Sequence, residues 1–215
     1  MSIPNGAGVQ TEIGILPPPL QKELPIWVTG QSDETFLAAG RLGFNVLTAN
    51  FALQHDLAKF VRKVKIYRDA IQAHHGRRGH VTLMAHAFVG ADRDAIRTIV
   101  RPAMAAYLKV NIGMQKDHSV GMKDERGFAG LNQRETEIMI RTQVNNDLHS
   151  PLSLIGTLEE CAHQADRLSK NGVDEIACLI DFGVGMEDVM ASVRRLSTLL
   201  ECAPRAAGPP PAPNG

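Results

Sequence analysis

A short polar segment directly after an apolar run is the clearest candidate for ligand binding in this sequence. Gly30–Ser32 follows the run Ile26–Thr29, and Thr35 comes three positions after Ser32. Glycine permits a tight turn, and a helix that starts here offers hydroxyls, backbone N–H groups and its positive dipole end to an anion. The segment therefore predicts a phosphate site. Helix capping by Ser32 or Asp33 explains the same residues about equally well, because capping uses the same groups.

His86 is the one weak candidate for a catalytic residue. It lies inside the apolar run HVTLMAHAFV at residues 80–89. A lone strand histidine is more often a hydrogen-bonded core residue than a base, and the difference narrows if its side chain faces the axis of a barrel near the carboxyl end of its strand. Asp181-Phe182-Gly183 matches a kinase metal-binding motif, but no accompanying kinase segment occurs, so a loop is the better interpretation. The eight histidines and three cysteines have no metal-ligand spacing, and no metal site is expected.

The composition is that of an ordinary globular protein. Of the 215 residues, 44% are hydrophobic and 21% charged, with 23 basic and 23 acidic side chains. A zero net charge argues against a dedicated binder of nucleic acid or of an anionic membrane. No apolar stretch approaches about 20 residues, and the N-terminus lacks the pattern of a secretory signal. We therefore expect a cytoplasmic protein with reduced cysteines.

Apolar runs alternate with amphipathic segments, which predicts α/β architecture with a parallel sheet. Strands are expected at 26–29, 44–48, 80–89 and 175–180. Helices are expected at 33–42, 55–74, 91–109, 157–170 and 186–200, with Pro102 bending or dividing the third. A long polar insertion at 114–152 carries one helical stretch near 133–144. Residues 1–24 suggest an extended lead-in, residues 25–202 the folded domain, and residues 203–215 a Pro/Ala-rich tail or linker.

Four segments together resemble luciferase-like, flavin-dependent monooxygenases, particularly those of natural-product biosynthesis. They are LPIWVTGQSDETFLAAGRLGFNVLTAN, KIYRDA, HVTLMAHAFVG and NGVDEIACLIDFGV. The resemblance covers roughly residues 13–113 and 154–200. It implies a partial TIM (β/α)₈ barrel, consisting of about four C-terminal β/α units with a long insertion. The complete fold needs about 250 residues, so the first four strands of the family's barrel are absent from this sequence.

The resemblance also implies a cofactor and its ligands. Family members carry reduced FMN, which activates O₂ to oxygenate a small organic substrate, and a separate flavin reductase is a possible partner. Carried over residue by residue, the family's phosphate turn and the strand ends beside it correspond to Thr29, Gly30, Gln31, Ser32, Thr35 and Thr48. Thr48 and His86 would line the flavin or substrate cavity. The insertion would cover the site.

Half a barrel leaves two sheet edges and one apolar face without cover. Self-association, a separately encoded N-terminal half, or origin in a longer polypeptide would each relieve this, and we favour the last, followed by a homo-oligomer (homodimerisation). The leading hypothesis is thus that the chain is part of an FMN-dependent monooxygenase and is inactive or weakly active alone. The alternative is a non-catalytic remnant acting as an oligomerisation or interaction module. A third, weaker hypothesis is a phosphate-ligand module that uses only the turn at 29–35.

Overall fold

Five parallel strands form the central sheet of the computed structural model, which describes residues 2–12, 14, 17, 20, 24–49, 56–118 and 131–202. The strands are β3 (Trp27–Thr29), β4 (Asn45–Ala49), β5 (Val81–Val89), β6 (Leu154–Gly156) and β7 (Glu175–Leu179). Their order is β3-β4-β5, and the far edge of β5 is shared by two strands. β7 pairs with Thr82–His86, and β6 pairs with Ala87–Val89. The predicted parallel α/β sheet is confirmed.

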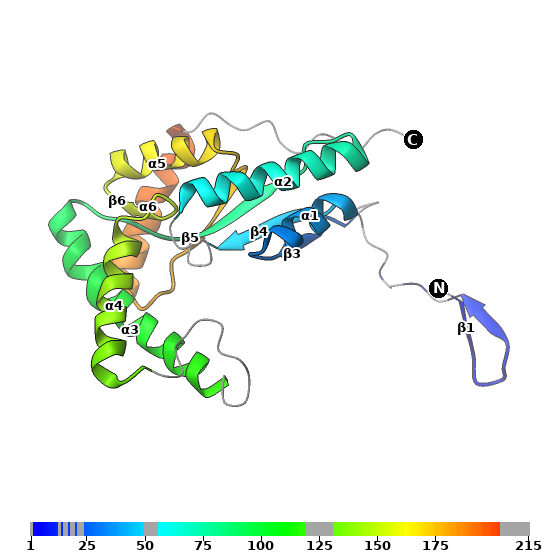
Figure 1. Ribbon diagram of the computed structural model, residues 1–215, viewed down its shortest axis with the longest axis horizontal. Helices are drawn as coiled ribbons and strands as arrows, with labels where there is room; N and C mark the ends of the chain where they lie inside the picture. Colours follow the sequence, from blue (N-terminus) through cyan, green and yellow to red (C-terminus); the bar gives the residue numbers. More distant parts are fainter. Residues whose placement is uncertain are drawn as a thin grey trace.

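Six helices accompany this sheet in the described part of the chain (Figure 1). They are α1 (Asp33–Leu42), α2 (Leu57–His75), α3 (Arg93–His118), α4 (Gln133–Leu148), α5 (Leu158–Lys170) and α6 (Met186–Cys202). Local sequence sets their ends. Ser32 caps α1, and Gly43 ends it with φ of 75°, a left-handed conformation that glycine adopts without strain. None of the described helices is long and apolar enough to cross a membrane.

The main core lies between one face of the sheet and the helices α1 and α2. Val46, Val81 and Leu83 of the strands pack against Phe36 of α1 and Phe60 of α2, all of them buried. The two helices approach closely at Gly40, where a β-carbon would lie 2.7 Å from the β-carbon of Ala70. A smaller cluster places Ala87 and Val89 against α5 and α6. The helices therefore cover the face of β5 that carries its odd-numbered residues.

Three features differ from the sequence-based expectation. The short strand β6 was missed, because its three residues follow the polar insertion and gain their structure by pairing with Ala87–Val89. Pro102 does not divide α3, which continues to His118 and so includes the first part of the expected insertion. Within the expected lead-in, Ser2–Pro4 and Gln10–Glu12 pair as a hairpin, β1–β2, which lies apart from the body in Figure 1. Residues 119–130 and the expected tail 203–215 lie outside the described residues.

A charged network joins α2 to the amino-terminal ends of β5 and β7. Arg68 donates to the carboxylate of Asp174 at 2.5 Å and to the backbone carbonyl of Gly79 at 2.7 Å. The same carboxylate accepts the N–H of Val81 at 2.7 Å and is paired with Arg78. Burial alone would raise the pKa of Asp174, but the Val81 N–H and the Arg68 guanidinium hold it below its usual value. This one carboxylate therefore holds a helix and two strands together.

The substitution Asp174→Asn should lower the free energy of unfolding by about 3 kcal/mol at pH 7, because it leaves the half-buried guanidinium of Arg68 without its charge partner. Urea unfolding measures this. Since the folded-state pKa is depressed, the carboxylate stabilises the fold above its unfolded pKa and loses that effect as the pH falls through the folded value. The difference between variant and parent should therefore shrink below the ordinary aspartate pKa of 3.8.

Asp69→Asn is the matched control, because Asp69 pairs with Lys65 on the exposed surface of the same helix α2. It should change the unfolding free energy by less than about 0.5 kcal/mol. Equal losses for Asp174→Asn and Asp69→Asn would contradict the assigned role of Asp174.

Candidate functional site

The second face of the sheet carries the residues that alternate with the core. Residues in direct register across parallel strands share a face, so Thr29, Leu47, Thr82 and Glu175 form one row. Two further rows follow toward the carboxyl ends of the strands, formed by Ala49, Met84, Ala177 and then by His86 and Leu179. Trp27 and Thr29 are exposed, and Leu47 and Met84 are half-buried. We call this the inner face, since it corresponds to the interior of a closed barrel.

Ser32 and Thr35 lie side by side in the first turn of α1. Their hydroxyl oxygens are 3.1 Å apart, and the Thr35 N–H donates to the Ser32 hydroxyl oxygen at 3.2 Å. Gly30 is required beside them, because a β-carbon there would lie 2.0 Å from the methyl carbon of Thr35. Gln31 and Ser32 are exposed. The turn therefore combines one exposed and one half-buried residue bearing a hydroxyl with the amino-terminal end of a ten-residue helix, as an anion site requires.

Two carboxylates beside this turn would repel a bound anion, to different degrees. Asp33 is paired with Lys63 at 2.7 Å and Arg62 at 2.6 Å, and its pKa is lowered first by the hydrogen bond from Lys63. Lys63 itself is buried with its charge directed at Asp33. The pKa of Glu34 is lowered first by its own backbone N–H and then by the Ser32 hydroxyl. The charge of Asp33 is therefore compensated, whereas Glu34 competes for one of the hydroxyls.

Thr48 belongs to the opposite face of the sheet. Its register partner is Leu83, and it follows Val46 by two positions, so its side chain lies on the face covered by α1 and α2. The residue is 1% exposed, and its hydroxyl has no hydrogen-bond partner among the described residues. The structure thus separates Thr48 from the inner face, where the resemblance had put it.

His86 lies on the inner face near the carboxyl end of β5, the position that strengthens it as a candidate. It is 1% exposed, and its ring meets those of Tyr107 and Phe182 edge to face, each with centroids 5.5 Å away. Tyr107 belongs to α3, and Phe182 follows β7. The neighbouring inner-face residue, Phe88, packs in one cluster with residues of α3 and α4. The helices before and within the expected insertion therefore cover this end of the inner face.

The comparisons with known proteins agree with this geometry. A family profile described as luciferase-like monooxygenase matches residues 5–175. The chain belongs to this family. A search of curated proteins found no match.

Solved structures of monooxygenases share the fold. The chain is 16% identical to the monooxygenase RslO1 of Streptomyces bottropensis, with a TM-score of 0.58, over 87% of this chain and 50% of that one. The chain is also 16% identical to the oxygenating constituent of 3,6-diketocamphane monooxygenase from Pseudomonas putida, which was solved in complex with FMN. The TM-score is 0.56, and the match covers 86% of this chain and 50% of that one. With an F420-dependent secondary alcohol dehydrogenase the identity is 12% and the TM-score 0.50, over 91% of this chain and 56% of that one. The chain spans about half the length of these structures, and its fold is a partial TIM barrel.

Sequence reasoning missed a polar network at the amino-terminal end of the inner face. The indole N–H of Trp27 donates to the hydroxyl of Thr82 at 2.9 Å, and that hydroxyl donates to the carboxylate of Glu175 at 2.8 Å. His80 reaches the same carboxylate at 3.2 Å. The alternation of Thr82, Met84 and His86 along β5 is the signal that could have predicted a second, more polar face. Among the described residues no three or more His, Cys, Asp or Glu side chains are grouped to hold a metal.

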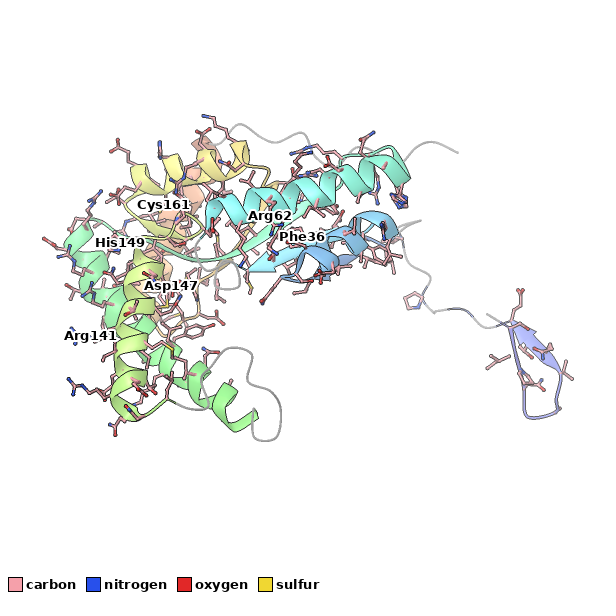
Figure 2. All side chains as sticks on the ribbon, in the orientation of Figure 1. Phe36, Arg62, Arg141, Asp147, His149 and Cys161 are labelled. Atoms are coloured by element: carbon pink, nitrogen blue, oxygen red, sulfur yellow. The ribbon has the colours of Figure 1, made fainter. Side chains whose placement is uncertain are left out.

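Asp147 is a buried acid in the α4 helix that helps to cover the site (Figure 2). It is 0% exposed, and burial raises its pKa to about 7, while a hydrogen bond with Gln143 acts in the opposite direction. Its backbone carbonyl accepts the hydroxyl of Ser153 at 2.9 Å, which ties the end of α4 to the chain leading into β6. At pH values between the ordinary pKa of 3.8 and the raised pKa of about 7, folding is therefore accompanied by uptake of a proton at this carboxyl group.

The insertion helices should be less stable above neutral pH because of this carboxyl group. A raised folded-state pKa contributes stability that is full below the unfolded pKa of 3.8 and is lost as the pH rises through about 7. Asp147→Asn keeps the shape of the protonated acid, so the variant should exceed the parent in unfolding free energy at pH 8.5 by up to about 4 kcal/mol. At pH 4 the variant and the parent should have equal free energies of unfolding. Urea unfolding at both pH values measures this, and a constant difference would contradict it.

Proposed function

We propose that this chain is part of an FMN-dependent monooxygenase that oxygenates a small organic molecule with O₂, in natural-product biosynthesis. The observation that carries this proposal is the Gly30–Thr35 turn at the carboxyl end of β3, within a chain of the luciferase-like monooxygenase family. Ligands bind at this end of the strands in TIM barrels. The FMN-bound relative from Pseudomonas putida supports the choice of cofactor.

The residues present fit the phosphate group of FMN. Ser32 and Thr35 would donate their hydroxyls to it, and Gly30 lets the backbone of the turn approach closely. Bound reduced FMN would supply the activation of O₂. The neighbouring rows of the inner face, from Thr29 to His86, would contact the ring system and the substrate. Tyr107 and Phe182 would keep water away from this end of the site, because they already enclose His86.

A closed site needs strands beyond those described here. β3 pairs only with β4 among the described residues, and Trp27 and Thr29 on its inner face are exposed. In a closed barrel every strand has two neighbours and the interior is filled by side chains. We therefore propose that further strands, from another part of a longer chain or from another subunit, complete the cavity and that a flavin reductase supplies reduced FMN.

The phosphate turn should distinguish FMN from riboflavin, which lacks the phosphate. We expect FMN to bind this chain about tenfold more tightly than riboflavin, because charge-assisted hydrogen bonds to the turn act only on FMN. The double variant Ser32→Ala with Thr35→Ala should remove that difference. Fluorescence titration measures both affinities, and Ser197→Ala, a substitution of an exposed serine on α6, is the control. Equal affinities for FMN and riboflavin in the unsubstituted chain would contradict the proposal that the turn binds the phosphate.

Glu34→Gln should act in the opposite direction and tighten FMN binding about threefold without affecting riboflavin. The substitution removes the carboxylate that competes for the Ser32 hydroxyl and repels a phosphate. The same titration measures it. Unchanged or weaker FMN binding would mean that the phosphate lies elsewhere.

Oxygenase activity is tested after completion of the barrel. The chain is expressed together with the segment encoded directly upstream, and oxygen uptake is followed with reduced FMN. We expect uptake that the Ser32→Ala, Thr35→Ala variant lowers at least tenfold at subsaturating FMN. Uptake no faster than that of free reduced FMN would overturn the monooxygenase proposal.

The alternative proposal is a non-catalytic module for oligomerisation or interaction. The exposed apolar residues Leu24, Ile26 and Trp27 beside the open edge of β3 favour it. It requires a stable oligomer without flavin affinity. Light scattering on the purified chain, combined with the FMN titration, separates it from the first proposal.

A further inference from the structure

A polar pocket lies where α3, α4 and α5 meet. Its volume is about 280 Å³, and β6 and the loop that precedes it complete the wall. Figure 2 shows His149 and Cys161, which line it, at this end of the molecule. One lining residue, Ile155, is in register with Phe88 of the inner face, but none belongs to the Gly30–Thr35 turn. The pocket is therefore separate from the turn proposed to hold the flavin phosphate.

The walls of the pocket are rich in arginine although the whole sequence has no net charge. Arg93, Arg97 and Arg101 are spaced four residues apart on one face of α3, and Arg167 approaches from α5. His149 adds a ring whose Nδ1 contacts the carbonyl of Asn145 at 2.8 Å, which leaves Nε2 free of that contact. This concentration of donors makes the pocket a region of positive potential.

The one acidic side chain in the wall is already compensated. Glu160 accepts the backbone N–H of Thr157 at 3.0 Å and is paired with Arg93. Its pKa is held below the usual value, first by the Thr157 N–H and then by Arg93. Arg93 is thereby neutralised, and Arg97 reaches Asp94 only at 3.8 Å on the exposed surface. The charges of Arg101 and Arg167 have no carboxylate partner among the described residues.

Arg167 is held in the wall of the pocket by a neighbouring side chain. One terminal nitrogen donates to the Gln164 side chain at 2.7 Å, but the buried Nε has no hydrogen-bond partner among the described residues. A buried donor without an acceptor is costly. The buried Nε is out of reach of the open pocket, so an anion there would bind to the terminal nitrogens of Arg167. The apolar side chains of Ile96, Leu148 and Ile155 lie in the same wall, so an organic group could share the pocket with the anion.

We infer that this pocket binds a small phosphate monoester. The arginine fork matches phosphate oxygens in pairs, and arginine keeps its charge at any physiological pH. A volume of about 280 Å³ accommodates a phosphate group together with a short organic chain, which would contact the apolar part of the wall. The inference is independent of the flavin proposal, since it uses no residue of the turn.

Calorimetric titration of the full chain with glycerol 3-phosphate, at constant ionic strength, tests the inference. We expect saturable binding at one site, weakened at least tenfold by Arg167→Gln and also by Arg101→Gln. Arg101 is exposed, so its substitution keeps the inference testable even if Arg167→Gln fails to fold. Arg194→Gln, on the exposed surface of α6, is the matched control and should bind like the parent. The Ser32→Ala, Thr35→Ala variant should also bind unchanged, which separates this site from the flavin turn.

Two results would overturn the inference. Binding that does not saturate, or that Arg101→Gln and Arg194→Gln weaken equally, would mean non-specific attraction to surface arginines. Succinate binding as tightly as glycerol 3-phosphate would mean that the pocket recognises negative charge without selecting phosphate.

Discussion

The two faces of β5 are the constraint on which the rest of this structure depends. Successive side chains of a strand point to opposite faces, so Val81, Leu83 and Ala85 enter the core under the helices while Thr82, Met84 and His86 lie on the inner face. β5 also has strand neighbours along both edges, namely β4 on one side and β6 with β7 on the other. One strand therefore supplies the core, the hydrogen-bonded centre of the sheet and the wall of the candidate site.

The amino-terminal ends of the strands are held by charge, and the carboxyl-terminal ends are covered by rings. Asp174 joins α2, β5 and β7 at the first end through Arg68 and the Val81 N–H. At the second end, Tyr107 and Phe182 enclose His86. This asymmetry is the one expected for a barrel, in which the amino-terminal face serves stability and the carboxyl-terminal face serves function. It also explains why α3 and α4 lie where they do, since their apolar residues cover the second end.

Much of the fold could be predicted from the sequence because local signals and packing agree. The cap at Ser32 and the left-handed Gly43 define α1 to the residue, and the apolar runs identify four of the five strands of the sheet. The strand β6 could not be found, since its three residues gain their structure by pairing with Ala87–Val89, a contact distant in sequence. The face of Thr48 could not be predicted either. A shift of one residue in the register of a strand moves every side chain to the opposite face. The pairing of β4 with β5 therefore determines on which face Thr48 lies.

The same argument explains what sequence could say about the binding sites. The Gly30–Thr35 turn was recognisable because its groups are contiguous, and contiguous groups keep their spacing in the folded chain. The arginine pocket was not, because Arg101 and Arg167 come from helices that meet only when β6 has brought α5 beside α3. A chain with equal numbers of acidic and basic side chains hides such a cluster in its average. Charge that is local in space but dispersed in sequence therefore has to be found in the fold. In this fold the arginine cluster lies apart from the Gly30–Thr35 turn that the flavin proposal uses.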